Sequence, residues 1–120
     1  MHHVLVIDDS AAVRQLLRLA LERSGYGVSE ACDGEDAYEL LDGRPLGLVI
    51  CDLSMPRMDG LSFLRLLRHH PRYRFTPVVV LSTETRPDRR EAAKAAGAQA
   101  FITKPCRPSD LVDAVQRLCH

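Results

Sequence analysis

Five short runs of aliphatic and β-branched residues alternate with stretches of helical periodicity along this chain, and no other feature limits its folding as strongly. The runs cover residues 3–7, 26–31, 46–51, 77–81 and 99–103. Strands that are apolar on both faces are typical of parallel sheets covered by helices on each side. The sequence therefore predicts an α/β fold: a doubly wound, five-stranded parallel sheet with five helices, joined by right-handed crossovers.

Cap residues and apolar spacing indicate where the five helices begin. The expected caps or first residues are Ser10, Asp33, Gly60, Asp88 and Pro108. The second helix should carry Ala37, Leu40 and Leu41, and Gly97 suits a left-handed cap after the fourth helix. The first helix should bury one apolar stripe, made of Val13, Leu16, Leu17, Ala20 and Leu21.

The length and charge of the chain predict one domain over residues 1–120. Sixteen basic and sixteen acidic residues cancel to a net charge of zero, so we expect no nucleic acid partner for this domain. No apolar run approaches the ~20 residues of a membrane span, and the first strand begins too early to leave room for a signal peptide. We therefore expect no membrane insertion and a cytoplasmic location.

The cysteine pattern argues against a zinc site. The four cysteines form no CxxC pair and no close cluster with histidine. We expect free thiols, as in a reducing cytosol, at Cys32, Cys51, Cys106 and Cys119.

Polar side chains follow four of the apolar runs, at the points where the predicted strands end. Asp8 and Asp9 follow the first run, and Asp52 follows the third. Ser82 follows the fourth run and Lys104 the fifth. In open parallel sheets the carboxyl ends of the strands share one edge, where ligands bind. We therefore expect three carboxylates, a hydroxyl and an ammonium to meet at that edge.

The three carboxylates predict a Mg²⁺ site. Converging like charges raise one another's pKa unless a cation relieves the repulsion, and Mg²⁺ needs only one or two carboxylates directly. Consecutive aspartates alone are more often a turn or a helix cap. Asp52, however, follows a buried strand, where structure alone gives no reason for an acidic residue. Ser82 and Lys104 would then neutralise the oxygens of a phosphoryl group carried by one carboxylate.

Four motifs, taken in order, resemble the receiver domain of two-component response regulators. They are Asp8-Asp9, the segment 52–60, Ser82-Thr83 and Lys104-Pro105. The resemblance extends over essentially the whole chain and is greatest to the stand-alone, chemotaxis-type regulators. It implies a flavodoxin-like strand order, 2-1-3-4-5, and a phosphorylation-dependent signalling switch rather than a conventional enzyme.

The resemblance implies a role for each acidic residue. Asp52 would be the phosphoacceptor, taking a phosphoryl group from a phosphohistidine on a histidine kinase or phosphotransfer protein. Asp9 would bind Mg²⁺ directly and Asp8 largely through water, with Asp52 sharing the ion. The backbone carbonyl of Ser54 would complete the protein ligands without adding negative charge.

The resemblance also implies a conformational switch. Lys104 would pair with a phosphoryl oxygen, and its peptide bond to Pro105 is expected to be cis. The Ser82 hydroxyl would move toward the phosphoryl group and leave space for Phe101, at the switch aromatic position, to turn inward. Phe101 lacks the hydroxyl of the tyrosine common there, which calls into question any step that needs that hydroxyl.

Other residues depart from the family pattern or vary within it. Thr83 stands where alanine or glycine is common, and its β-branch would narrow access to the phosphoryl group. Cys106 replaces an aromatic residue, and its thiol is either reactive or simply packed. Ser54 and Glu84 occupy the variable positions beside the acceptor that tune dephosphorylation.

A downstream effector is expected on the face formed by the fourth helix, the fifth strand and the fifth helix. Four cationic residues fall on or just before the fourth helix: Arg86, Arg89, Arg90 and Lys94. They form either a basic docking surface or an ordinary solvated helix face.

Three other interpretations stay open on the sequence. An aspartyl-phosphate hydrolase of the haloacid dehalogenase type also uses a strand-end aspartate with Mg²⁺, but it needs a second aspartate where Ser54 stands. A flavodoxin needs a phosphate-binding loop after the first strand, where Asp8 and Asp9 would repel a phosphate. The third is a receiver excised from a hybrid kinase or a transcription regulator. Met1 and His120 lie close to the outermost elements, as in a free-standing protein, but fragment boundaries would look the same.

Overall fold

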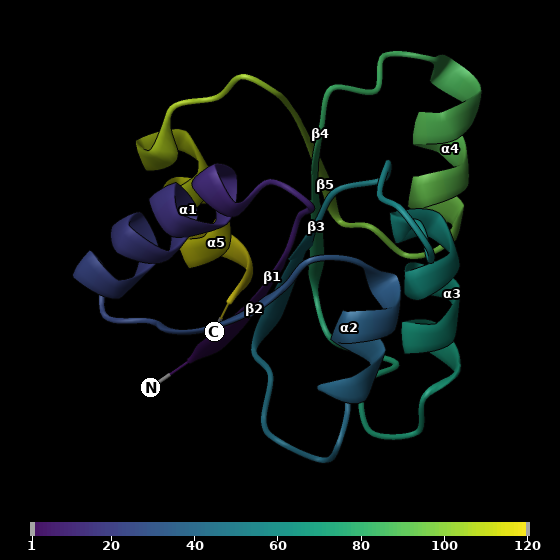
Figure 1. The fold of residues 1–120 in the computed structure, drawn as a ribbon, viewed down its shortest axis with the longest axis horizontal. Coiled ribbons are helices and arrows are strands. Elements are labelled where there is room, and N and C mark those ends of the chain that lie inside the picture. Colours follow the sequence, from purple (N-terminus) through teal and green to yellow (C-terminus); the bar gives the residue numbers. More distant parts are fainter. Residues whose placement is uncertain (1, 120) are drawn as a thin grey trace.

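The structure, a computed structural model, describes residues 2–119 and contains one parallel sheet between two layers of helices (Figure 1). The strands are β1 (His3–Ile7), β2 (Gly27–Ala31), β3 (Leu48–Cys51), β4 (Val78–Ser82) and β5 (Ala100–Thr103). The helices are α1 (Ala11–Arg23), α2 (Gly34–Glu39), α3 (Gly60–His69), α4 (Pro87–Ala95) and α5 (Pro108–Leu118). The strand order β2-β1-β3-β4-β5, with parallel pairing throughout, confirms the predicted fold. Met1 and His120 lie outside the described residues.

Strand pairing explains where the observed strands differ from the predicted runs. β3 begins two residues later than predicted, because its pairing with β1 starts at Leu48, opposite Val4. β4 continues one residue further than predicted, because Ser82 pairs with Thr103 of β5. β2, β4 and β5 each begin one residue later, and α4 begins one residue earlier.

The predicted caps of α1 and α2 are confirmed. The Ser10 hydroxyl accepts a hydrogen bond from the backbone N–H of Val13 at 3.3 Å. The Asp33 carboxylate accepts from the N–H of Asp36 at 2.9 Å, which starts α2. α2 is shorter than predicted: it ends at Glu39, and the buried Leu41 follows the helix rather than lying in it. Gly97, with a φ of 99°, adopts the left-handed conformation predicted after α4.

Two apolar cores lie on opposite faces of the sheet. Figure 1 shows α1 and α5 on one side and α2, α3 and α4 on the other. Alternate residues of β1 serve the two cores: Leu5 and Ile7 pack toward α2 and α3, whereas Val4 and Val6 pack toward α1 and α5. Within residues 2–119, no helix is both long and apolar enough to cross a membrane.

The prediction for the buried stripe of α1 is wrong at one residue. Leu17 and Leu21 are buried as expected, but the side chain of Leu16 is 52% exposed. Leu16 lies about 100° around the helix from Leu17, which places it beyond the edge of the stripe that meets the sheet. Leu19 is also half exposed, so α1 presents two leucines to the outside.

Arg68 joins the end of α3 to the loop before β4 and to the end of α4. Its guanidinium donates to the carbonyl oxygens of Arg74 at 3.0 Å, Thr76 at 2.7 Å and Gly97 at 2.8 Å. It also donates to the carbonyl of Ala96 at 3.3 Å. One side chain therefore satisfies carbonyl groups at the end of α4 and in the loop before β4.

We expect Arg68→Ala to lower the free energy of unfolding by about 2 kcal/mol, because the carbonyls lose charge-assisted hydrogen bonds while staying partly buried. Chemical denaturation monitored by circular dichroism measures the loss. Arg65→Ala, an exposed arginine one turn earlier on α3, serves as the matched control and should change stability by less than about 0.5 kcal/mol. Equal effects of the two substitutions would contradict this role for Arg68.

Candidate functional site

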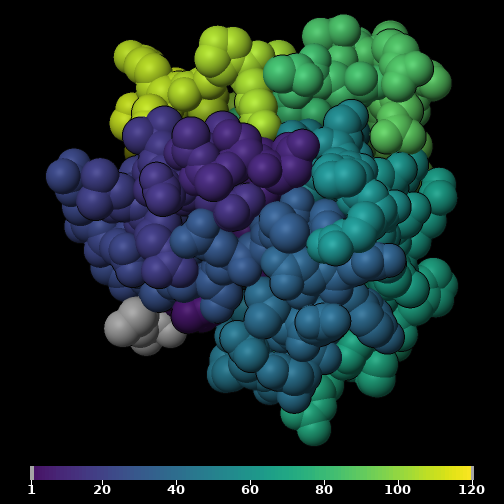
Figure 2. All heavy atoms as spheres, in the orientation of Figure 1, coloured from purple at the N-terminus to yellow at the C-terminus, as the bar shows by residue number. Residues whose placement is uncertain are grey.

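The carboxyl ends of the strands place the predicted site residues at one edge of the sheet, the upper edge in Figure 1. The backbone N–H of Asp52 continues the β1–β3 pairing by donating to the carbonyl of Ile7 at 3.0 Å. Lys104 continues the β4–β5 pairing in the same way, with its N–H donating to the carbonyl of Ser82 at 2.9 Å. In the space-filling view, the purple N-terminal, teal and green segments meet along this side of the molecule (Figure 2).

Three carboxylates converge there, as predicted. One oxygen each from Asp8, Asp9 and Asp52 can be chosen so that all lie within 4.8 Å of one another. Asp8 is 2% exposed and Asp52 is 7% exposed, whereas Asp9 is exposed. The cluster is therefore open to solvent through Asp9 and buried on its other sides.

Lys104 provides the positive charge in this cluster. Its Nζ donates to Oδ2 of Asp8 at 2.6 Å and to Oδ2 of Asp52 at 2.9 Å. Burial alone would lower the pKa of Lys104, but the hydrogen bonds to Asp8 and Asp52 outweigh that effect and raise it. The lysine is therefore an ammonium ion at neutral pH, shared between two aspartates.

The donor set fits a hard divalent cation. Three carboxylates against one ammonium leave a net negative charge, and oxygen atoms spaced within 4.8 Å can share one ion. The second oxygens of the buried aspartates are already fixed: Oδ1 of Asp8 accepts from the N–H of Ser10 at 2.9 Å, and Oδ1 of Asp52 from that of Ser54 at 3.2 Å. The carboxylates are thus oriented before any ion arrives.

Ser82 and Thr83 lie at the end of β4, on the same edge of the sheet as this cluster. Ser82 is fully buried at the end of the strand, and its hydroxyl accepts a hydrogen bond from the N–H of Glu84 at 3.2 Å. Thr83 is exposed. The predicted cis peptide bond between Lys104 and Pro105 is present.

Phe101 is half-buried on the outer strand β5, and Arg90 of α4 covers its ring. The guanidinium carbon of Arg90 lies 4.4 Å from the ring centroid. The same guanidinium donates to Oγ1 of Thr103 at 2.5 Å and to the carbonyl of Glu84 at 3.5 Å. Arg90 therefore connects the β4–α4 loop to β5, and its cation–π contact holds Phe101 without a hydroxyl on the ring.

Three of the four cations predicted to cluster around α4 have partners within the domain. Arg86 pairs with the Glu84 carboxylate at 2.6 Å, and Arg89 lies 3.9 Å from the same carboxylate. Arg90 is engaged with Phe101. These contacts engage three of the four cations within the domain itself, and Lys94 is exposed on α4.

The surroundings of Cys106 favour packing over reactivity. Its side chain is half-buried against the core under α1 and α5. Burial, followed by the charge of Asp110, raises the pKa of the thiol, which disfavours the reactive thiolate. Within residues 2–119 all four cysteines are free thiols, as expected.

Gly60 and Arg57 contribute to the site in ways that the sequence interpretation missed. A Cβ atom at Gly60 would lie 2.8 Å from the carbonyl carbon of Asp52 and closer still to its oxygen, so only glycine fits there. Arg57 pairs with the buried Asp33 at the start of α2. A glycine at the end of the 52–60 motif was a visible signal for the first feature; nothing local in the sequence marks the second.

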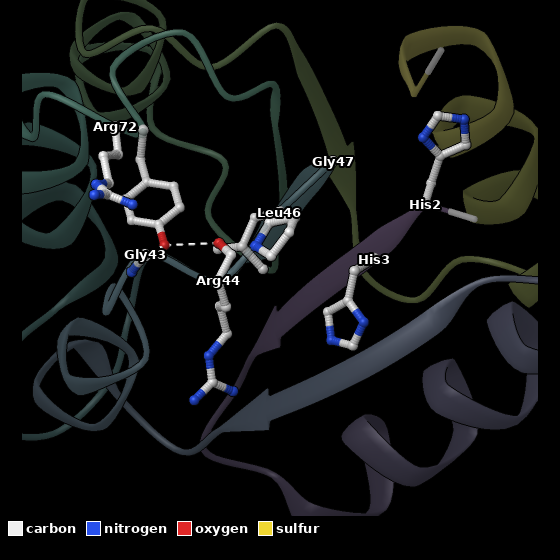
Figure 3. Close-up of a pocket in the computed structure, with 9 residues that line it drawn as sticks. His2, His3, Gly43, Arg44, Leu46, Gly47 and Arg72 are labelled. Atoms are coloured by element: carbon white, nitrogen blue, oxygen red, sulfur yellow. Dashed lines mark hydrogen bonds between the residues drawn. The ribbon is translucent and has the colours of Figure 1, made fainter.

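A separate cavity of about 490 Å³ lies at the opposite edge of the sheet, near the start of β1 (Figure 3). Its wall includes Gly43 and Tyr73, whose hydroxyl donates to the carbonyl of Arg44 at 2.7 Å. In Figure 3 the side chains of His2 and Arg72 point in different directions. None of the clustered aspartates lines this cavity, so its size does not mark the chemistry of the protein.

Comparisons with known proteins agree with this geometry. Residues 4–116 match the family model described as the response regulator receiver domain. The chain is 32% identical over 117 residues to the transcriptional regulatory protein SrrA of Staphylococcus aureus (strain NCTC 8325 / PS 47), an alignment that covers 98% of this chain and 47% of that protein. The chain therefore spans about half the length of the curated relatives it matches.

Solved structures include similar proteins of two further kinds. The chemotaxis protein CheY4 of Vibrio cholerae superposes with a TM-score of 0.93 at 36% identity, covering 98% of both chains. The signal receiver domain of a signal transduction histidine kinase from Syntrophus aciditrophicus superposes with a TM-score of 0.90 at 33% identity, covering 99% of this chain and 90% of that one. With this fold, this site and these matches, the chain belongs to the response regulator receiver domain family.

Proposed function

We propose that Asp52 accepts a phosphoryl group from a phosphohistidine on a histidine kinase or phosphotransfer protein, with Mg²⁺ as the required cofactor. Receiver domains act as phosphoacceptor switches, and they typically bind Mg²⁺ in an acidic pocket. The observation that carries the proposal is the cluster of Asp8, Asp9 and Asp52 with Lys104 between two of them. Magnesium supplies charge neutralisation for the phosphoryl oxygens when it is bound.

Each protein group around the acceptor Asp52 has a separate role in this proposal. Asp9 would hold the ion directly, Asp8 would hold it largely through water, and the carbonyl of Ser54 would add a neutral ligand. Oδ1 of Asp52 accepts from the N–H of Ser54 and Oδ2 accepts from Lys104, so both contacts orient the acceptor carboxylate. Lys104 is already in contact with Oδ2 and moves onto a phosphoryl oxygen as charge builds up there.

The switch begins at Ser82, whose hydroxyl turns from the N–H of Glu84 toward the phosphoryl group. The hydrogen bond between Ser82 and the phosphoryl group is available only in the phosphorylated state. It therefore supplies the differential affinity that a population shift requires. Phe101 then turns inward and releases the stacked Arg90. Thr83 is exposed at the end of β4 and limits access to the phosphoryl group. Ser54 and Glu84 tune the lifetime of the phosphorylated state.

The output surface in this proposal is the face of α4, β5 and α5. A cavity of about 240 Å³ lies between α4 and β5, and Arg90, Lys94 and Phe101 contribute to its wall. Because the proposed switch residue forms part of this wall, its rotation changes the surface that a downstream protein effector meets. The domain needs neither nucleic acid nor membrane insertion for this role.

A stand-alone, chemotaxis-type regulator is the form of the protein that we propose. The similarity to the V. cholerae chemotaxis regulator over 98% of both chains supports it. The matches to SrrA and to a kinase receiver domain keep a receiver within a longer regulator as the alternative. The start and stop codons of the gene in its genome distinguish the two.

The test of the proposed function is phosphorylation by a small acyl phosphate or phosphoramidate donor in the presence of Mg²⁺. We expect intact-mass spectrometry to show one added phosphoryl group on the unaltered protein and none on Asp52→Asn. Asp113→Asn, an exposed aspartate on α5, is the matched control and should accept phosphate normally. Equal modification of Asp52→Asn would refute the proposal. Equal phosphorylation of the unaltered protein when Mg²⁺ is chelated before the donor is added would also refute it.

A further inference from the structure

We propose that Arg57 is a positioning residue for the metal ion and that it acts by fixing the β3–α3 loop to the start of α2. This inference rests on the proposed function, because the carbonyl of Ser54 would reach the ion from that loop. Arg57 acts through the backbone rather than by touching the ion. Three observations support this role.

The first observation is an ion pair between the half-exposed Arg57 and a buried carboxylate. Nε of Arg57 donates to Oδ2 of Asp33 at 2.5 Å, and a terminal nitrogen of the same guanidinium pairs with that oxygen. The Asp33 side chain is almost fully buried, whereas that of Arg57 is 56% exposed. The N–H of Asp36 lowers the pKa of Asp33, and Arg57 lowers it further against the effect of burial. Arg57 is therefore the counter-ion of a buried carboxylate that also caps α2.

The second observation is a backbone hydrogen bond beside that ion pair. The N–H of Gly34 donates to the carbonyl of Met58 at 2.9 Å. A Cβ atom at Gly34 would lie 2.8 Å from that oxygen, so the absence of a side chain allows the close approach. Two consecutive residues at the start of α2 thus hold two consecutive residues of the loop.

The third observation is the backbone conformation of Arg57. Its φ is 61°, and it is the only non-glycine residue with positive φ among residues 2–119. A residue with a Cβ atom is disfavoured in this region, and glycine would adopt it at lower cost. The contacts of the Arg57 side chain with Asp33 therefore offset a backbone cost that glycine would avoid.

These contacts link the anchor to metal affinity through loop order. Near the acceptor, the N–H of Gly60 donates to the carbonyl of Leu53 at 3.0 Å, and the N–H of Ser54 donates to Asp52. Arg57 fixes the C-terminal part of the same loop to Asp33 at the start of α2. An anchored loop would hold the Ser54 carbonyl in place before the ion binds. The free energy of ion binding then does not have to offset the conformational entropy lost when the loop becomes ordered.

Isothermal titration of the metal-free chain with Mg²⁺ tests the inference. If removal of the anchor leaves the competent loop conformation only ~10–30% populated, the dissociation constant rises about 3- to 10-fold. We expect this weakening in Arg57→Ala and in Arg57→Gly. Glycine suits the positive φ, so Arg57→Gly should unfold at a higher temperature than Arg57→Ala while binding Mg²⁺ just as weakly. Arg57→Lys keeps the charge and should recover part of the affinity.

Asp33→Asn is the partner substitution, since asparagine still caps the helix but removes the ion pair. It should weaken Mg²⁺ binding as Arg57→Ala does, and the double variant should be no weaker than either single variant. Failure of the unaltered protein to bind Mg²⁺ would contradict both the proposed function and this inference. Normal Mg²⁺ binding by the unaltered protein, with Arg57→Ala and Asp33→Asn within twofold of it, would overturn this inference alone. Recovery of full affinity in Arg57→Gly would also overturn it, because the side chain would then be dispensable.

Discussion

Gly60→Ala should nearly abolish phosphorylation of this protein while leaving it folded at low temperature. The added Cβ atom would lie 2.8 Å from the carbonyl carbon of Asp52 and 2.9 Å from Cα of Leu53, and both are backbone atoms that cannot turn aside. The chain must therefore move at the point where it carries the acceptor. Overpacking of this kind costs about 1–3 kcal/mol of stability, and a displacement near 1 Å at a reacting group can cost ~100-fold in rate.

The measurement is the initial rate of phosphorylation by a small phosphodonor, at a temperature where circular dichroism shows both proteins folded. Gly25→Ala is the matched control, because Gly25 has a φ of 93° and a Cβ atom added there would meet only open space. It should lose stability through its backbone alone and keep a normal rate per folded molecule. A Gly60→Ala rate within twofold of the unaltered rate would contradict the proposed contact between α3 and the acceptor.

Lys104→Ala should change metal binding and phosphorylation in opposite directions. In the absence of metal, the ammonium group balances Asp8 and Asp52 at 2.6 and 2.9 Å, so it competes with Mg²⁺ for the same carboxylate charge. Removing it should strengthen Mg²⁺ binding several-fold and lower the stability of the metal-free protein. The phosphoryl oxygens would then lack their ammonium partner, and loss of such a group costs about 100- to 1,000-fold in rate.

Paired titrations and rate measurements on Lys104→Ala test both halves. Lys94→Ala, an exposed lysine on α4, is the matched control and should alter neither Mg²⁺ affinity nor phosphorylation rate. Parallel losses of Mg²⁺ affinity and stability, with an unchanged rate per folded molecule, would show that Lys104 serves only the fold.

The stability contributed by Lys104 has a defined pH dependence. Its pKa is raised in the folded protein, so the folded state holds this proton more tightly than the unfolded chain does. The contribution is therefore complete below the unfolded pKa of about 10.4 and is lost as the pH rises through the folded value. At neutral pH the ammonium is fully formed, and the metal site does not depend on small changes in pH through this group.

The sheet and the acidic cluster were predictable because both follow from local patterns. An apolar run marks each strand, and parallel strands bring their carboxyl ends together wherever their sequences lie. Asp8, Asp9, Asp52 and Lys104 could therefore be placed at one edge before their distances were known. The roles of these residues in phosphate transfer came from the family resemblance rather than from the pattern.

The features that could not be predicted depend on rotation or on loop conformation. Leu16 fits the spacing of a buried stripe, and only the rotation of α1 against the sheet exposes it. Arg68 looks like an ordinary surface arginine until the loop before β4 and the end of α4 meet around it. The pairing of Arg57 with Asp33 joins residues 24 positions apart and needs a left-handed backbone conformation that the sequence gives no reason to expect.

Chemical identification of the phosphorylated side chain tests the central claim most directly. Borohydride reduces an aspartyl phosphate to homoserine, which peptide mass spectrometry then assigns to one position in the chain. We predict homoserine at position 52 alone, formed only when Mg²⁺ is present during phosphorylation. Homoserine at Asp8, Asp9 or Asp59 in place of Asp52, or equal amounts with and without Mg²⁺, would contradict the account.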